Sequence, residues 1–244
     1  MTSRLTLGRL VAGAAIVCVF QLAQAATLYD PALNTLPSAQ GWTTAGIGPY
    51  SESVAAGTYQ FSTLQLNATQ AGSARFGNAA LDTASGFTLD FNLRVLSEVH
   101  AREDRAGFSI IMTGLDPAHS IEIAFWGDHV WSYTSSFAHG VDAAFDTMGA
   151  AHDYALVVKN DAYVLKADGT TLFSGPLVDY VGQPYDSAGF LFFGDDTSSA
   201  RSQVELGRIT LTAAAVPAVP EPATTALFAI GLVALALTRR VYRG

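Results

Sequence analysis

Two adjacent carboxylates followed by hydroxyl side chains form the segment best suited to binding a metal ion. Asp195 and Asp196 follow a glycine and precede Thr197, Ser198 and Ser199. Carboxylate and hydroxyl oxygens gathered in a turn are the kind of ligand that Ca²⁺ takes. No cofactor is predicted from the sequence, but Asp195 and Asp196 are the candidate ligands should Ca²⁺ bind. The alternative is an Asx-type turn, in which the same side chains bond to nearby backbone groups.

Aromatic side chains gather in a second segment. Trp126, Trp131 and Tyr133 surround the short polar segment 127–129, and Phe137 follows them. Aromatic rings beside polar groups can stack on sugar rings, so Trp126, Trp131 and Tyr133 are candidates for binding carbohydrate. Positions 131 and 133 of a strand point the same way, and the alternative is that these rings face the core.

No motif of a catalytic centre is present in the sequence. Glu122 has no carboxylate two or four residues away, whereas glycosidases need a pair of carboxylates at ~5 Å or more. The sequence has no Gly-x-Ser-x-Gly or His-Glu-x-x-His pattern and no phosphate-binding loop. We expect solvated side chains near turns for the histidines, which are His100, His119, His129, His139 and His152. The chain is predicted not to be an enzyme, and a divergent glycoside hydrolase is the alternative.

The elements that position these residues have the period of β-strands. Residues 87–95 alternate apolar and polar side chains, which predicts a half-buried strand. Its inward face consists of Phe87, Leu89, Phe91, Leu93 and Val95. Further strands are predicted at residues 58–61, 63–68, 74–76, 106–113, 120–126, 130–135, 153–159, 162–167, 171–174, 188–193 and 204–212.

The connections between these segments are typical of an all-β protein. Asn160-Asp161 and Asp168-Gly169 favour positive φ, which predicts tight hairpins. Residues 98–105 mix charges of both signs and are expected to form a solvated loop between two strands. No segment of residues 26–212 has a helical pattern, so the expected fold is an antiparallel β-sandwich or barrel.

The first 25 residues have the composition of a secretory signal peptide. Arg4 and Arg9 precede an apolar segment, residues 10–20, and Ala23-Gln24-Ala25 forms a small-x-small cleavage site. Signal peptidase is therefore expected to cut after Ala25. The only cysteine, Cys18, lies in the apolar segment, so the exported chain folds without a disulfide.

One β-sandwich domain is predicted over residues 26–212, and residues 213–218 are an alanine-rich linker. Residues 26–218 contain 8 basic and 20 acidic side chains, a net charge of −12. A surface this acidic repels phosphate backbones, which argues against nucleic acid as a partner.

A three-part tail ends the chain. Pro220-Glu221-Pro222 is followed by an apolar segment of 15 residues, 223–237, and then by Arg239, Arg240 and Arg243. A helix of 15 residues would cover about 23 Å, short of a hydrocarbon core of ~30 Å. The sequence predicts a weak transmembrane segment over residues 223–238, with the basic end in the cytoplasm. A plain single-span anchor is the alternative.

This tail, residues 219–244, resembles the PEP-CTERM sorting signal of Gram-negative bacteria. The resemblance implies that an exosortase processes the chain at or near Pro220-Glu221-Pro222 after export. It also implies a place in the cell envelope or outside the cell, and a link to exopolysaccharide or biofilm.

The order of the predicted strands resembles that of concanavalin A-like and laminin-G-like jelly rolls. The resemblance rests on the strands at residues 87–95, 106–113 and 121–126, the turn Asp168-Gly169 and the returning strand 204–212. This fold occurs in lectins, glycosidases and adhesion modules, so it fixes no function. Two hypotheses follow: a non-catalytic protein of the cell surface or extracellular matrix, or a lectin-like carbohydrate-binding module, with or without calcium.

Overall fold

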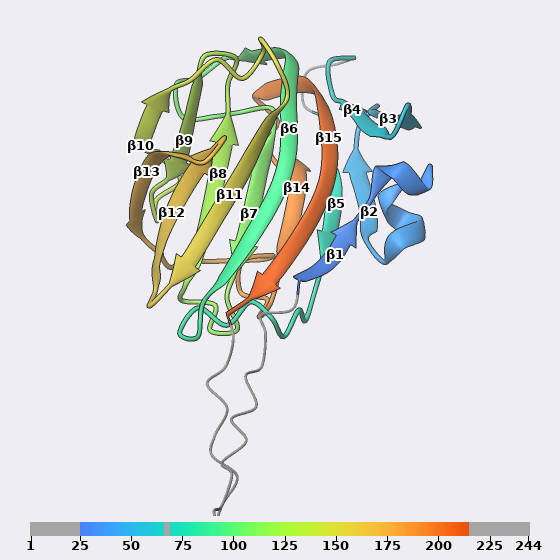
Figure 1. The fold of residues 1–244 in the computed structure, drawn as a ribbon. Coiled ribbons are helices and arrows are strands. Elements are labelled where there is room, and N and C mark those ends of the chain that lie inside the picture. Colours follow the sequence, from blue (N-terminus) through green and yellow to red (C-terminus); the bar gives the residue numbers. More distant parts are fainter. Residues whose placement is uncertain (1–24, 66–68, 215–244) are drawn as a thin grey trace, which may run out of the picture. The chain divides into compact units, whose positions relative to one another are not determined.

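The computed structural model describes residues 25–65 and 69–214, which form two antiparallel β-sheets packed face to face (Figure 1). The predicted sorting tail, its transmembrane segment and the signal peptide up to residue 24 lie outside the described residues. Within the described part of the chain, no helix has the length and apolar character needed to cross a membrane.

The sheets contain eight and seven strands. The eight-stranded sheet has the order β13 (Thr170–Pro176), β12 (Ala162–Ala167), β11 (His152–Lys159), β6 (Phe87–His100), β15 (Ala200–Ala213), β4 (Thr58–Ser62) and β3 (Ser51–Ala55), and β1 (Ala25–Tyr29) pairs with β15. The seven-stranded sheet has the order β10 (His139–Ala144), β9 (His129–Tyr133), β8 (Ser120–Phe125), β7 (Ser109–Thr113), β14 (Leu191–Asp195), β5 (Gln70–Arg75) and β2 (Thr43–Ile47). Two short 3₁₀ helices, η1 (Pro31–Leu33) and η2 (Pro37–Gln40), follow β1. The predicted all-β antiparallel sandwich is confirmed.

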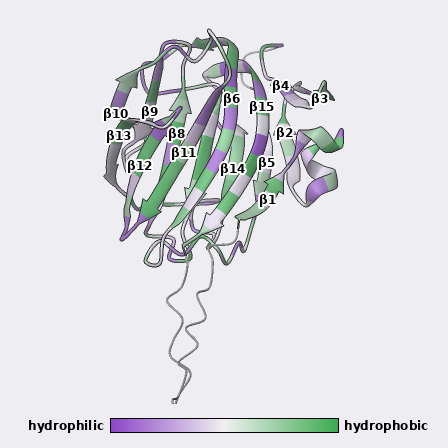
Figure 2. Ribbon diagram, viewed as in Figure 1, coloured by the Kyte–Doolittle hydropathy of each residue, from purple (hydrophilic) through white to green (hydrophobic). Residues whose placement is uncertain are grey.

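Strand β6 shows why the sequence folds in this way. All five apolar residues predicted to face inward are buried, and the polar residues between them are half-buried. Figure 2 shows this alternation as green and purple bands along β6. Because successive side chains point to opposite faces of a strand, the apolar set lies between the two sheets.

Aromatic rings from both sheets meet in this core. Phe125 of β8 packs edge to face against Phe91 of β6 and Tyr154 of β11, with ring centroids 6.0 and 5.3 Å apart. Phe108, just before β7, lies 6.1 Å from Phe125. These contacts hold one sheet against the other without a disulfide.

The predicted hairpins have the expected backbone conformation. Asn160 and Asp161 join β11 to β12 with φ of 51° and 58°. Asp168 and Gly169 join β12 to β13 with φ of 49° and 79°. Positive φ at both central residues matches the twist of the flanking strands, which explains why these residue types stand here.

Several sequence predictions need correction. The strand predicted at residues 63–68 is wrong over residues 63–65, because Thr63 instead hydrogen-bonds across the sandwich to Asp195. Residues 98–100 are not solvated loop but the end of β6, and the Glu98 side chain is only 6 % exposed. Strands β1, β2, β3 and β10 were not predicted. Apart from β1, they are largely exposed edge or near-edge strands with no apolar alternation.

Strands β7 and β8 are buried on both faces. In β8, Ile121, Ile123 and Phe125 point into the main core, while Glu122 and Ala124 point to the outer face of the seven-stranded sheet. Residues 178–190 cross that outer face, and Tyr180 and Tyr185 of this segment form a second apolar cluster with it. The outer face is therefore roofed rather than open to solvent.

The two ends of the described domain lie together. Ala25 of β1 pairs with Thr212 near the end of β15, so residues 25 and 214 are at the same end of the sandwich (Figure 1). The start of β15 pairs with the end of β6, through Ala200 and His100. A strand of 14 residues spans about 40 Å, so the loops at residues 101–105 and 196–199 lie at the opposite end.

Candidate binding cleft

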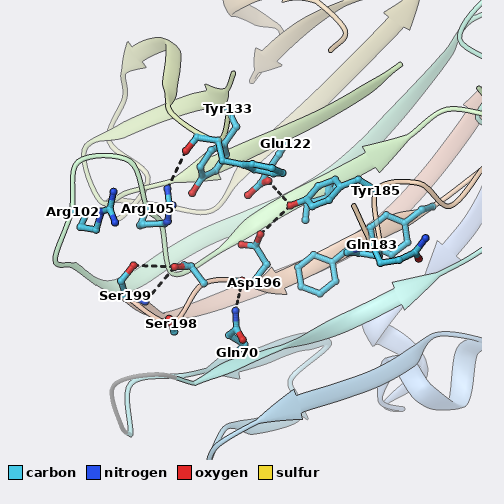
Figure 3. Close-up of a pocket in the computed structure, with 16 residues that line it drawn as sticks. Gln70, Arg102, Arg105, Glu122, Tyr133, Gln183, Tyr185, Asp196, Ser198 and Ser199 are labelled. Carbon is cyan, nitrogen blue, oxygen red and sulfur yellow. Dashed lines mark hydrogen bonds between the residues drawn. The ribbon is translucent and has the colours of Figure 1, made fainter. Parts of the chain in front are cut away.

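A cleft of about 620 Å³ lies on the outer face of the seven-stranded sheet, at the end opposite the two chain ends. Figure 3 shows its lining residues. The polar lining includes Gln70, Glu122, Gln183, Asp196, Ser198 and Ser199, and the aromatic lining includes Tyr133, Phe137, Tyr185 and Phe192. A hollow of this size that combines rings with a few polar groups is typical of a small-ligand site.

Each wall of the cleft comes from a different part of the chain. Strands β8 and β9 supply Glu122 and Tyr133, whose outward direction follows from the alternation of the strands. Asp196 follows β14, and Gln70 of β5 donates a hydrogen bond of 2.7 Å to its backbone oxygen. Tyr185 comes from the segment that crosses the sheet. Only the fold brings these residues together.

Two carboxyl groups meet at the bottom of the cleft. The Tyr185 hydroxyl oxygen lies 2.9 Å from Glu122 Oε2 and 3.2 Å from Asp196 Oδ2 (Figure 3). A phenol carries one proton, so it donates to only one of the two carboxyls at a time. The other contact is a hydrogen bond only when that carboxyl carries a proton of its own.

The surroundings of the pair favour such a proton. Glu122 is 1 % exposed, and burial together with the charge of Asp196 raises its pKa well above the usual range. Burial also raises the pKa of Asp196. Two carboxylates this close repel each other in a medium of low polarity, so the pair holds one proton more readily than none.

The structure separates the two aspartates that are candidate calcium ligands. Asp195 is buried and points away from the cleft, where its Oδ2 accepts a hydrogen bond of 2.7 Å from Thr63 and its Oδ1 one of 3.1 Å from the Thr197 backbone. Asp196 points into the cleft toward Tyr185. Among residues 25–65 and 69–214, no group of three histidine, cysteine or acidic side chains is placed to hold a metal ion.

Asp195 makes the stability of the domain depend on pH. Burial raises its pKa from 3.8 to about 8, so the folded state favours the protonated carboxyl. A raised pKa in the folded state gives stability that is full below pH ~4 and is lost as the pH rises toward 8.

We expect the Tm to fall from pH 5 to pH 8.5, and Asp195→Asn to remove part of that fall. Thermal melts of the unmodified domain and of Asp195→Asn across this pH range measure the fall in Tm. Asp179→Asn, at an exposed position, is the control. Equal slopes of Tm against pH for the unmodified domain and Asp195→Asn would refute this role of Asp195.

The predicted sugar-stacking residues lie in different places. Trp126 and Trp131 are buried in the outer-face cluster, with ring centroids 5.4 Å apart, and present no free face to the cleft. Tyr133 is also buried but lines the cleft, as does Phe137. Of the three predicted sugar-binding residues, Tyr133 is therefore the one placed to contact a ligand, and the tryptophans support it from behind.

The sequence predicts solvated histidines near turns, but three of them pack on the tryptophans of the outer-face cluster. His100 stacks on Trp126 at 4.2 Å and His139 on Trp131 at 4.3 Å, both nearly parallel. His129 lies edge-on to Trp126 at 6.4 Å. The prediction failed because the register between β9 and β10, which brings His139 beside Tyr133, is not visible in a single sequence.

The arginines of the cleft are already paired. Arg102 bonds both carboxylate oxygens of Asp104, at 3.0 and 3.2 Å. Arg105 donates to the backbone oxygens of Asp104 and Phe137 and forms an ion pair of 3.1 Å with Asp104. Neither arginine forms an ion pair with Glu122 or Asp196 in the described part of the chain, although the charge of Arg105 lowers the pKa of Asp196 against the larger effect of burial.

This architecture, two antiparallel sheets with a cleft on the outer face of one of them, is that of a galectin- and concanavalin-like β-sandwich. Solved structures with the same fold include a carbohydrate esterase from Shiga toxin-encoding bacteriophage phi24B, with 15% identity, coverage of 78% of this chain and 99% of that one, and a TM-score of 0.55. A protein of unknown function with a galectin-like fold from Bacillus subtilis has 9% identity, coverage of 81% and 99%, and a TM-score of 0.52.

Domain 4 of the extracellular arabinanase AbnA from Geobacillus stearothermophilus is also similar, with 16% identity, coverage of 79% and 94%, and a TM-score of 0.50. That structure was solved in complex with arabinotriose. Identities this low show a shared fold and nothing more. A search of curated proteins finds no match.

The end of the chain is more specific. Residues 218–240 match the PEP-CTERM protein-sorting motif. The chain thus carries a PEP-CTERM signal, which marks an exported protein sorted by an exosortase to the surface or the exterior of a Gram-negative cell. Pro220, Glu221, Pro222, Arg239 and Arg240 lie inside this match and outside the residues that the structure describes.

Proposed function

We propose that the protein is a non-catalytic carbohydrate-binding module displayed on the cell surface or in the extracellular matrix. The cleft carries this proposal: it combines the rings of Tyr133, Tyr185 and Phe192 with the polar side chains of Gln183 and Ser198. Rings supply flat apolar area for a sugar, and the polar groups supply partners for its hydroxyls. The arabinotriose bound by the similar arabinanase domain supports the same use of the fold.

The carboxyl pair favours binding over hydrolysis. Retaining glycosidases hold their two carboxyls ~5–5.5 Å apart, and inverting enzymes hold them farther apart. Here the Tyr185 hydroxyl contacts both carboxyls, at 2.9 Å from Glu122 and 3.2 Å from Asp196. That hydroxyl takes the place that a glycosidic oxygen would need between an acid and a nucleophile.

The position of the cleft suits display. The loops at residues 101–105 and 196–199, which border the cleft, lie about one β15 length, ~40 Å, from both ends of the described domain. Signal peptidase would release a chain that begins at Ala26, and an exosortase would act on the other end. A domain held by either end presents its cleft away from the point of attachment, toward exopolysaccharide or biofilm polymers.

Glycan binding tests the proposal. We expect the purified domain to bind one class of oligosaccharide on a glycan array, and Phe192→Ala and Gln183→Ala each to weaken binding about tenfold, the equivalent of ~1.4 kcal/mol. Phe192 is half-buried and lines the cleft, so its loss removes contact area without opening the main core. Titration calorimetry with the array's best ligand measures the change.

Leu33→Ala is the matched control, because Leu33 is 64% exposed on η1 and does not line the cleft. It should bind as the unmodified domain does. An array with no bound glycan, with and without calcium, would contradict the proposal and leave a purely structural matrix protein as the better account.

A further inference from the structure

We infer that the cleft selects glycans with a free amino group, whose ammonium binds the unpartnered oxygens of Glu122 and Asp196. This inference rests on the proposed function and names the class of sugar that the same cleft takes. It concerns amino sugars that lack an N-acetyl group.

Two unpartnered oxygen atoms carry the inference. Glu122 Oε1 and Asp196 Oδ1 are both buried and have no hydrogen-bond partner among residues 25–65 and 69–214. Buried polar atoms nearly always have a partner, so these two acceptors mark a position for a donor from outside the protein. Both residues line the cleft: Glu122 lies in β8, and Asp196 directly follows β14.

The charge of the site fits an ammonium. An ammonium has three N–H donors and one positive charge, which suits two carboxyl groups that form no ion pair with a basic side chain of residues 25–65 and 69–214. The nearest arginines are bound to Asp104 and to backbone oxygens. An acetamide has one N–H, no charge and an added acetyl group, so it neither satisfies both oxygens nor fits as closely.

The remaining lining favours a sugar over a lysine side chain. The rings of Tyr133, Phe137 and Phe192 line the same cleft as the carboxyl pair, and Ser198 and Ser199 add hydroxyls to it. A hexosamine places its amino group directly on a ring that can stack and hydrogen-bond at once. A lysine brings only a narrow flexible chain, which would leave most of a 620 Å³ cleft unfilled.

Matched oligosaccharides test the inference. Titration calorimetry of the purified domain in the presence of a chelator compares a glucosamine trisaccharide with the N-acetylglucosamine trisaccharide of equal length. We expect at least tenfold tighter binding of the amino sugar. Glu122→Gln and Asp196→Asn should each abolish that preference, while Glu103→Gln, an exposed side chain of the neighbouring loop, should keep it. Thermal melts establish whether each variant is folded. If one of the two carboxyl variants does not fold, the loss of preference is judged from the other carboxyl variant.

Several results would overturn the inference. Equal affinity for the two trisaccharides, or a preference that survives both carboxyl variants, would remove the ammonium contact while leaving glycan binding intact. Competition by oligolysine as strong as by the amino sugar would assign the site to a peptide. Binding of calcium alone that Glu122→Gln eliminates would assign it to a metal ion. Failure of every glycan to bind would instead refute the proposed function itself.

Discussion

Replacement of Phe125 by alanine is expected to destabilise the domain by about 3–5 kcal/mol, the usual cost of deleting a large buried aromatic ring. Phe125 is fully buried and packs on Phe91 and Tyr154 of the opposite sheet and on Phe108 of its own. Its removal leaves a cavity where the two sheets meet. Close packing in the interior lets the neighbouring rings relax only in part, so the cavity persists.

Thermal and denaturant unfolding measure this effect. A domain of this length loses ~2–4 °C of Tm per kcal/mol, so the predicted fall is about 6–20 °C. Phe76→Ala deletes the same ring at a position that is 56% exposed and should cost less than about 1 kcal/mol. Comparable losses in the two variants would show that the inter-sheet aromatic cluster does not hold the sandwich together.

The long strands were predictable because one of their faces is buried. Residues 87–95 alternate cleanly, and β6 has the predicted inward face. The hairpins at Asn160-Asp161 and Asp168-Gly169 followed from residue types that tolerate positive φ. Strands β2, β3 and β10 have small or polar residues on both faces, and they are held by backbone pairing that leaves no periodic pattern.

The cleft was only partly predictable. Asp196 and Tyr133 lie in segments whose composition indicates binding. Glu122, in contrast, has no carboxylate two or four residues away, so the sequence does not indicate a site there. Its partner is far away in sequence, and Tyr185, which joins the two carboxyls, sits in a segment with no regular pattern. Pairing of this kind depends on how residues 178–190 cross the sheet, which is a tertiary property.

Side-chain direction explains the other differences. Asp195 and Asp196 are adjacent, and successive residues at a strand end point to opposite faces. One therefore enters the core network with Thr63 and the other enters the cleft, although the sequence suggested that they act together. Trp126 and Trp131 belong to the buried cluster on the outer face of the seven-stranded sheet. Residues 178–190 cross that face, so the tryptophans are buried there rather than exposed to solvent.

The largest expected effect on the whole protein comes from its tail. Changing Pro220-Glu221-Pro222 to three alanines should leave the protein exported but retained in the inner membrane with its tail attached. Prolines lack a backbone donor and favour extended backbone, so we expect a helix to begin only after Pro222. An extended peptide just outside the bilayer is what a membrane peptidase can bind, and alanines would let the helix extend through it.

Replacing Arg239, Arg240 and Arg243 should have a different result. An apolar segment of 15 residues is short for a membrane anchor, so we expect the arginines to hold it from the cytoplasmic side. Without them, unprocessed chain should enter the periplasm. Cell fractionation with one antibody against the domain and another against an epitope added after Gly244 separates the two outcomes.

A host strain that lacks its exosortase is the control, because there the unmodified protein should behave like the triple-alanine variant. In the complete host, the domain should reach the surface or the medium without the epitope. If the unmodified protein keeps the epitope in every fraction while the exosortase is present, the result would contradict processing of the tail. The tail would then be a plain membrane anchor, and its match to the sorting motif at residues 218–240 would carry no proteolytic step.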